Sequence, residues 1–377
     1  MKIEKISSYN FSSVFADRNS FGSPLGLKNI SIVKISTKCG TSGLGEAYVG
    51  IYIPDIFSAI VKEIESFLLG KNPEEIINSN FHIPFVSRNG IFKSIYSAID
   101  IALWDIVAKK RKKPLYKLLS DNENNYKIYS SGGMVNSNLE ELDKNIRLAK
   151  KLGHSGFKMR VGKQDWKNDV KRIDFAFKLT KKLNLKLMVD AIMGTINPPW
   201  KIKKDFFKIK AISKKVYWLE EPFHPDNIED YQNLIKKNLL TVATGEALSG
   251  QLDYKTYILN NLCHIIQLDI SSCGGFSEAI KVLKLAKKKK IKIAMHVWGS
   301  EIASTANAHF AFAFPEIKWL EYPLAQPKIN KYLNNYYNNS ISYKFQKNMK
   351  NHGLGIECNI RKLQSNFKYI YGSKYKI

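Results

Sequence analysis

Ionisable side chains that can bind a cation or carry a proton recur regularly in the second half of the chain. They stand at or near the ends of short apolar runs and are Asp190, Glu220, Glu246, Asp269, His296 and Glu321. Successive spacings are 30, 26, 23, 27 and 25 residues, and Glu220 is followed directly by Glu221. Such an interval fits one strand plus one helix, so we expect each group to come from its own βα unit.

Three of these groups predict a metal site. Asp190, Glu220 and Glu246 would repel one another in a partly buried position unless a cation lay between them. All-oxygen ligation without Cys or His suits a hard ion that keeps room for water and substrate oxygens, as Mg²⁺ does. We therefore expect these residues to be Mg²⁺ ligands. The alternative for each residue alone is that it caps the helix that follows its strand.

Asp269 and His296 come from the next two units and predict a general base. A neighbouring carboxylate can hold an imidazole in one tautomer and raise its basicity. For the other histidines we expect ordinary packed or surface positions, and they are His82, His154, His224, His264, His309 and His352.

Two cations occur two residues apart in "KMR", so Lys158 and Arg160 point to the same face of a strand. Facing a pocket, they would bind the carboxylate of a substrate and crowd its α-carbon. The alternative is that they pair with acidic residues of the barrel floor.

Eight β-rich runs from residue 126 onward must position these groups. They alternate with amphipathic helical stretches and are "YKIYSS", "GFKMRV", "KLMVDA", "VYWLEE", "TVATGE", "IIQLDI", "KIAMHV" and "IKWLEY". Eight strands with helices between them close into a parallel barrel whose carboxyl ends share one mouth, where catalytic groups gather. We expect a TIM-type (β/α)7β barrel over residues 123–325.

The flanking segments have a different pattern. Residues 28 to 39 and the stretch around "GEAYVGIYI" alternate as in an antiparallel sheet, whereas "DIFSAIVKEIESFLLG" and "SIYSAIDIALWDIVAKKRKKPLYKLL" indicate amphipathic helices. We expect an α+β capping domain over residues 1–122, with the segment 326–377 packing back onto it.

Composition excludes several classes of protein. The chain has 377 residues with 44% hydrophobic and 24% charged residues, and we find neither a membrane span nor a signal peptide. Its four cysteines (Cys39, Cys263, Cys273 and Cys358) have no C-x-x-C spacing, as in a reducing compartment. We expect a cytoplasmic protein without a membrane partner.

The formal net charge is +26, an excess that could attract nucleic acid or an anionic substrate. The lysines are dispersed, and the run "KKKK" at 287 to 290 closes an amphipathic helical stretch. Dispersed lysines favour a solvated surface, so we expect no nucleic-acid partner.

The chain resembles the mandelate racemase and muconate lactonizing enzyme branch of the enolase superfamily, because its motifs follow one another in the order typical of that family. The motifs "KMR", "VDAIMG", "WLEEP", "TGEALSG", "QLDISSCGG", "MHVWGS" and "WLEYP" carry the resemblance, with "SAIDIALWDIVAKK", "PLYKLL" and "HGLGIECN" outside the barrel. The resemblance implies the same Mg²⁺ ligands and the same His296–Asp269 dyad. It further implies that Glu321 hydrogen-bonds the substrate carboxylate or its enolate, and that Lys158 neutralises that carboxylate.

The chemistry implied by the family begins with removal of the proton next to a carboxylate, giving an enediolate. Racemases of this branch keep a second lysine where this chain has Arg160, and a guanidinium stays protonated. With His296 as the evident base, we expect dehydration of a sugar acid to a 2-keto-3-deoxy acid. Arg160 would then bind substrate, and the alternative is a racemase or epimerase of a 2-hydroxy acid.

Loops of the capping domain set specificity in this family. Here they correspond to residues 15 to 26 and to "GEAYVGIYIP", so we expect Arg18, Phe21 and Tyr48 to contact the sugar acid unless they are ordinary loop residues. We also expect a homo-oligomer.

Overall fold

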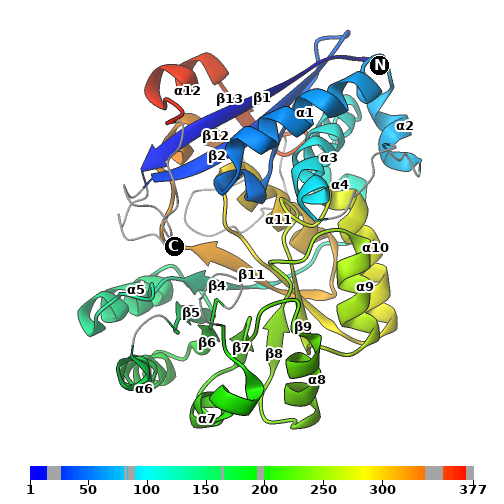
Figure 1. Ribbon diagram of the computed structural model, residues 1–377. Helices are drawn as coiled ribbons and strands as arrows, with labels where there is room; N and C mark the ends of the chain where they lie inside the picture. Colours follow the sequence, from blue (N-terminus) through cyan, green and yellow to red (C-terminus); the bar gives the residue numbers. More distant parts are fainter. Residues whose placement is uncertain are drawn as a thin grey trace.

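The computed structural model describes residues 1–14, 27–79, 83, 90–162, 165–192, 199–335 and 351–370. These residues form a closed barrel and a smaller α+β unit that lies above one end of it (Figure 1).

Eight parallel strands close the barrel in the order β10-β11-β4-β5-β6-β7-β8-β9. Seven helices connect successive strands, which confirms the (β/α)7β expectation. The strands are β4 (Lys127–Ser131), β5 (Gly156–Arg160), β6 (Lys186–Asp190), β7 (Trp218–Glu220), β8 (Val242–Thr244), β9 (Ile265–Leu268), β10 (Lys292–Met295) and β11 (Ile317–Pro323).

The connecting helices bury one apolar stripe each against the strands. In the first of them, Leu142, Ile146 and Ala149 are buried, and a reciprocal capping box between Asn138 and Glu141 fixes its start. The helices are α5 (Leu139–Lys151), α6 (Trp166–Lys182), α7 (Ile202–Ile212), α8 (Ile228–Lys236), α9 (Gln251–Leu259), α10 (Gly275–Lys288) and α11 (Glu301–Ala313).

An apolar plug fills the interior of the barrel. Ring pairs such as Tyr129–Trp218 (centroids 5.2 Å apart) and Trp218–Trp319 (5.9 Å) meet edge to face. The plug consists of Tyr129, Met188, Trp218, Ala243, Ile265, Ala294 and Trp319. These side chains occupy the interior, and the acidic groups of the mouth lie at the carboxyl ends of the strands.

The N-terminal unit is a three-stranded antiparallel sheet packed on helices. Its elements are β1 (Ile3–Val14), β2 (Leu27–Thr37), β3 (Ser42–Glu46), the 3₁₀ helix η1 (Tyr48–Ile51), α1 (Pro54–Leu68), α2 (Pro73–Asn78), α3 (Ile91–Lys110) and α4 (Leu115–Leu119). Two expectations were wrong in detail. The strand pattern around "GEAYVGIYI" ends at Glu46, and the helical pattern from 94 to 119 is broken before Pro114, which starts a new helix.

Close contacts join this unit to the barrel. Asp100 of α3 accepts a hydrogen bond from Ser277 N of α10 (3.1 Å), and Trp104 Nε1 donates to Ser277 Oγ (3.1 Å). Gly275 has a φ of +80°, and a Cβ there would lie 2.2 Å from Asp100 Oδ2. Glycine is therefore required for this approach of the two helices.

The C-terminal segment contacts the N-terminal unit. Its elements are η2 (Lys328–Tyr332), β12 (Leu333–Asn335), β13 (Ile356–Cys358) and α12 (Ile360–Asn366). Ile329 N donates to Ser13 Oγ (3.1 Å), and Leu354 N donates to Asp105 Oδ1 of α3 (2.8 Å). The boundaries at 122/123 and 325/326 remain predictions.

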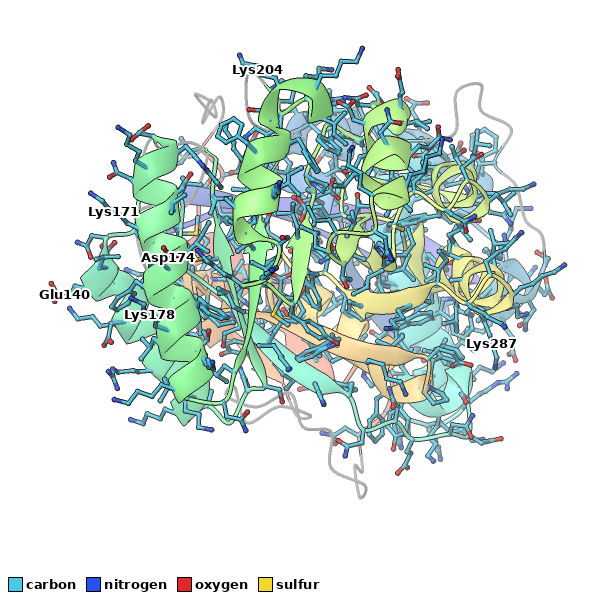
Figure 2. All side chains as sticks on the ribbon, turned by 90° about the horizontal axis from the view of Figure 1, so that it is seen from below. Glu140, Lys171, Asp174, Lys178, Lys204 and Lys287 are labelled. Atoms are coloured by element: carbon cyan, nitrogen blue, oxygen red, sulfur yellow. The ribbon has the colours of Figure 1, made fainter. Side chains whose placement is uncertain are left out.

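Basic side chains are spread over several helices. Figure 2 shows Lys171 and Lys178 on α6, Lys204 on α7 and Lys287 on α10, all of them exposed. Helices of the described residues are too short or too polar to cross a bilayer.

Candidate active site

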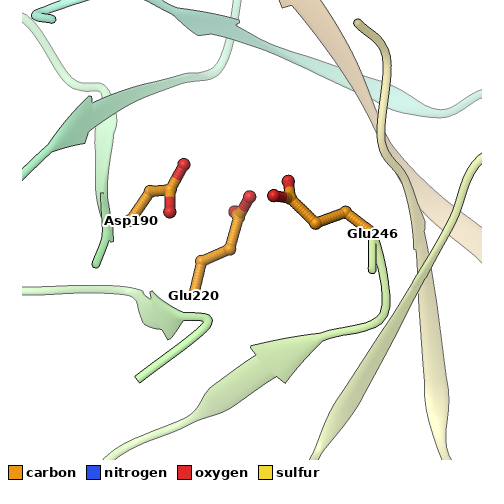
Figure 3. A group of neighbouring side chains, drawn as sticks. All are labelled: Asp190, Glu220 and Glu246. Atoms are coloured by element: carbon orange, nitrogen blue, oxygen red, sulfur yellow. The ribbon is translucent and has the colours of Figure 1, made fainter. Parts of the chain in front are cut away.

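Three carboxylates converge at the mouth of the barrel. Asp190 and Glu220 are the last residues of β6 and β7, and Glu246 follows the end of β8. Each offers an oxygen that lies within 4.8 Å of the others (Figure 3). Asp190 and Glu220 are partners in the β6–β7 register, so strand pairing itself holds these two side by side.

Helix capping does not account for these carboxylates. The N-cap residues of the helices that follow are Lys201, Asn227 and Gly250. Asp190 Oδ1 instead accepts a hydrogen bond from Ile192 N of its own loop (2.9 Å), and Glu220 Oε2 accepts one from Trp218 Nε1 (3.2 Å).

Burial disfavours the charged forms of two of these groups. It raises the pKa of Asp190, and it raises the pKa of Glu220 to about 8, with Lys158 opposing both shifts. A divalent cation would offset most of the negative charge of the three carboxylates, and the all-oxygen donor set fits Mg²⁺. The residues present therefore fit the expected ion.

Across the cavity, Asp269 and His296 form a hydrogen-bonded pair. His296 Nδ1 lies 2.9 Å from Asp269 Oδ2. The other carboxylate oxygen accepts from Ser271 N (2.8 Å), Ser271 Oγ (2.6 Å) and Asn307 Nδ2 (2.9 Å). These donors fix the carboxylate, which in turn fixes the imidazole ring and assigns the Nδ1 proton to the side of Asp269.

The second ring nitrogen faces the carboxylate cluster. His296 Nε2 lies 3.0 Å from Glu246 Oε2 and 4.0 Å from Glu321 Oε2. Burial alone would lower the pKa of His296, but the charge of Glu246 and the hydrogen bond to Asp269 raise it well above its ordinary value. The same contact outweighs burial at Glu246 and lowers the pKa of that carboxyl to about 2.

Lys158 lies among the carboxylates. Its ammonium contacts Glu220 Oε1 and lies 3.1 Å from Glu321 Oε1 and 3.7 Å from Asp190 Oδ2. Burial alone would lower the pKa of this lysine, but the acidic neighbours raise it. These acidic partners belong to the carboxylate cluster at the mouth of the barrel, and not to its floor.

Arg160 lies at the side of the same cluster. Its Nε is 3.6 Å from Asp190 Oδ2, and its guanidinium carbon is 4.8 Å from the ring centre of Trp298. Burial opposes its charge, but Asp190 and other acids raise its pKa, so Arg160 stays protonated.

Glu321 is held as an acceptor. Its Oε2 accepts hydrogen bonds from Tyr129 OH (3.1 Å) and Val297 N (3.3 Å). Burial would raise its pKa, but Lys158 and His296 lower it. Its Oε1 lies 3.1 Å from Lys158 Nζ, and a hydrogen bond from Glu321 to a substrate carboxylate or enolate stays a prediction.

Glu221 is hydrogen-bonded to the end of β8. It has a φ of 44°, and its Oε1 accepts from Thr244 Oγ1 (2.8 Å) and Gly245 N (2.9 Å). It therefore ties the ends of β7 and β8 together.

The capping domain closes the site from above. The Tyr48 ring meets the His296 ring edge to face with centroids 5.6 Å apart, and Tyr48 N donates to Ser271 O (2.9 Å). The two hydroxyls of Tyr48 and Tyr52 lie 3.0 Å apart. Arg18 and Phe21 lie outside the described residues.

A small cavity of about 40 Å³ lies between these groups. Its lining residues are Tyr48, Tyr52, Arg160, Asp190, Ile192, Glu246, His296 and Trp298. Tyr52, Ile192 and Trp298 were not predicted. The available signals were that Tyr52 belongs to the stretch "GEAYVGIYIP" expected to close over the barrel, and that Ile192 and Trp298 belong to the motifs "VDAIMG" and "MHVWGS".

Two family models match the chain. The model described as "Mandelate racemase / muconate lactonizing enzyme, N-terminal domain" matches residues 21–120, and "Enolase C-terminal domain-like" matches residues 141–362. The chain is 30% identical to L-talarate/galactarate dehydratase of Salmonella typhimurium over 79% of this chain and 74% of that protein. It is 27% identical to arabinonate dehydratase of Saccharolobus solfataricus, over 78% of each chain.

Solved structures of enzymes have the same fold as this chain. One of a 3,6-anhydro-D-galactonate cycloisomerase from Zobellia galactanivorans superposes with a TM-score of 0.82 at 25% identity, covering 98% of this chain and 100% of that one. A structure of L-talarate/galactarate dehydratase liganded with Mg and L-glucarate also has a TM-score of 0.82 at 25% identity, covering 98% and 92%. The chain therefore belongs to the mandelate racemase and muconate lactonizing enzyme branch of the enolase superfamily, a family of enzymes.

Proposed function

We propose that the protein is a Mg²⁺-dependent dehydratase that converts a sugar acid into a 2-keto-3-deoxy acid. One observation carries the proposal: the Asp269–His296 pair faces three clustered carboxylates across one small cavity. Relatives named as sugar acid dehydratases support it.

Asp190, Glu220 and Glu246 would hold the cation. When bound, Mg²⁺ supplies positive charge that stabilises the substrate carboxylate as its α-carbon loses a proton. Lys158, whose pKa its acidic neighbours raise, adds a second positive charge. Glu321 pairs with its ammonium, and Tyr129 donates a hydrogen bond to Glu321.

In its neutral form, His296 acts as the base. Its Nε2 takes the proton from C2, while Asp269 keeps the Nδ1 proton in place and stabilises the imidazolium that forms. The electron pair of the C2–H bond is then delocalised into the carboxylate as an enediolate.

The imidazolium can complete the reaction. When the C3–O bond breaks, the leaving hydroxyl takes the proton from Nε2 and departs as water, and the resulting enol becomes the 2-keto acid. One residue then serves as base and acid, so the proton and the hydroxyl leave from one face of the substrate.

Arg160 favours this reaction over racemisation. A racemase needs a second proton carrier on the face opposite His296, and a guanidinium with a raised pKa does not release its proton. Arg160 and Tyr48 line the cavity and would bind substrate hydroxyls or a carboxylate.

The test is incubation with a panel of sugar acids and Mg²⁺ in deuterated water. We expect a 2-keto-3-deoxy product, detected by its semicarbazone and by NMR. Deuterium at C2 of an inverted, otherwise unchanged acid, without keto product, would instead establish the racemase.

A further inference from the structure

A cavity of about 690 Å³ lies between the N-terminal sheet and the C-terminal segment. Strands β1, β2 and β3 form one wall with the end of α3, and β13 forms the other with the start of α12, which lies beside β1 in Figure 1. This capping-domain cavity shares no described lining residue with the active-site cavity. Its volume falls within the roughly 300–1,000 Å³ that is typical of small-molecule sites. It can therefore hold a ligand other than the reacting substrate.

A buried carboxylate fixes one corner of the capping-domain cavity. Asp105 of α3 is 0% exposed and accepts hydrogen bonds from Leu44 N of β3 (3.1 Å) and Leu354 N (2.8 Å). Lys109 Nζ donates to Asp105 Oδ2 (2.7 Å) and to Ser42 O (2.9 Å). Asp105 thus offsets the charge of Lys109, and these bonds hold α3, the sheet and the C-terminal segment together around a preformed cavity.

Two further basic side chains line the cavity from its two walls. Lys34 is half-buried on β2, and Arg361 is exposed on α12. Neither forms a hydrogen bond or an ion pair with any residue that the structure describes. Burial raises the pKa of the Cys358 thiol on β13 to about 11, and the charge of Lys34 opposes this rise, so that charge acts across the cavity. Two unpaired cations that line one cavity favour a bound anion.

Glu357 is the acidic residue among the described lining residues. It is exposed, whereas its neighbours on β13 are Ile356, which is buried, and Cys358, which is half-buried. Because side chains alternate along a strand, Glu357 lies on the opposite face of β13 from these two residues. Glu357 therefore belongs to the rim of the cavity, and it pairs with neither Lys34 nor Arg361.

Apolar side chains also line the cavity. Leu44 lies opposite Lys34 in the β2–β3 register, and Ile356 and the aromatic ring of Tyr9 lie on the two walls. A bare inorganic ion would leave this apolar surface in contact with water, whereas an apolar group would cover it. The lining therefore fits a ligand that combines an acidic group with an apolar body.

We propose that the capping-domain cavity is a second ligand site, and that it binds a small organic anion with a carboxylate or phosphate group on an apolar body. The acidic group binds Lys34 and Arg361, and the apolar body lies against Leu44, Ile356 and Tyr9. This site is separate from the barrel mouth, so it does not depend on which reaction His296 performs.

Calorimetric titration with benzoate and with phenyl phosphate tests the site and tells the two acidic groups apart. The titrations are done without Mg²⁺, so that no ion at the barrel mouth attracts the probes. We expect at least one probe to bind, and Lys34→Met or Arg361→Met to weaken its binding about 10- to 100-fold. If Lys34→Met does not fold, Lys34→Gln gives the same decision. Benzyl alcohol, which lacks the acidic group, should bind more weakly than either anion.

Lys362→Met is the matched control for charge. It removes one exposed positive charge from α12, but Lys362 does not line the cavity, so binding should be unchanged. This control is needed because a chain with a net charge of +26 attracts anions non-specifically. Equal weakening in the Lys34, Arg361 and Lys362 variants, or no binding of either anion to the wild-type protein, would overturn the proposal.

A blocking variant locates the ligand independently of charge. Gln364 is exposed on α12 and lines the cavity, so Gln364→Trp should fill part of it and weaken binding of the same probe. Ser365→Trp adds the same side chain at the next exposed position, which does not line the cavity, and should leave binding unchanged. A probe that binds Gln364→Trp as tightly as the wild-type protein would lie elsewhere and contradict the proposal.

Discussion

The Nδ1 atom of His296 lies 2.9 Å from Oδ2 of Asp269, and Nε2 of the same ring faces the carboxylate cluster. The pair joins the carboxyl ends of β9 and β10, strands that are hydrogen-bonded neighbours. Asp269 orients the ring on one side, and on the other Nε2 lies 3.0 Å from Glu246 Oε2 and is the nitrogen that we propose to take the proton.

Replacing His296 by Asn should lower kcat by about 10²- to 10⁴-fold, because the proton acceptor is lost. Calorimetric titration with Mg²⁺ should still detect binding, since the three carboxylates are untouched. The matched control is His352→Asn, on an exposed histidine away from the mouth, which should retain activity. Full activity in the His296 variant would remove the dyad from the mechanism.

Replacing Arg160 by Lys should introduce exchange at C2. A lysine amine can lose its proton and act as a base, whereas the guanidinium cannot. NMR in deuterated water should then detect deuterium entry with inversion in the variant but not in the wild-type enzyme. Arg160→Met removes the charge without adding a base and should show no inversion, so inversion in that variant would contradict the explanation.

Magnesium should stabilise the folded protein. An ion at 100 times its Kd adds about 2.7 kcal/mol to the free energy of unfolding, and chelation removes that gain. Thermal melting with and without Mg²⁺ measures it. Asp190→Asn should reduce the gain, while Glu140→Gln, on the exposed face of α5 (Figure 2), should not. Equal gains in both variants would place the ion elsewhere.

Asp100 should make stability depend on pH. Burial raises its pKa to about 7, whereas an unfolded Asp titrates near 3.9, so between about pH 4 and 7 the folded state binds the extra proton. This group's contribution to stability is therefore present below about pH 4 and is lost as pH rises through 7, an effect on the order of a few kcal/mol.

Urea unfolding at several pH values tests this effect. Relative to the wild-type protein, Asp100→Asn should gain stability as pH rises from 4 to 7, because the amide never ionises. The exposed Asp121→Asn should follow the wild-type curve. A constant difference between Asp100→Asn and wild type across this range would show that Asp100 does not titrate as argued.

The barrel was predictable because its strands are buried on both faces and appear as apolar runs. In β6, "KLMVD" passes from an apolar stretch to a carboxylate at the strand end, and the same transition recurs in later units. Strand β1 was missed because "IEKISSYNFSSV" mixes charged and hydroxyl residues with apolar ones and lacks that continuity.

Contacts between domains were not predictable from local patterns. Lys28 lies in a strand that alternates like any other, and nothing in its neighbourhood indicates that it reaches Trp298, 270 positions later in the sequence. Tyr52 likewise belongs to a segment that favours a strand by composition but forms the end of a 3₁₀ turn over the cavity. Tertiary packing decides both cases.

The central claim is that Asp190, Glu220 and Glu246 hold one hard cation opposite His296. Anomalous diffraction from crystals grown with Mn²⁺ in place of Mg²⁺ tests it most directly. We predict one strong peak roughly 2.0–2.3 Å from an oxygen of each of the three carboxylates. A peak bound by other residues, or none between these carboxylates at saturating Mn²⁺, would contradict the account.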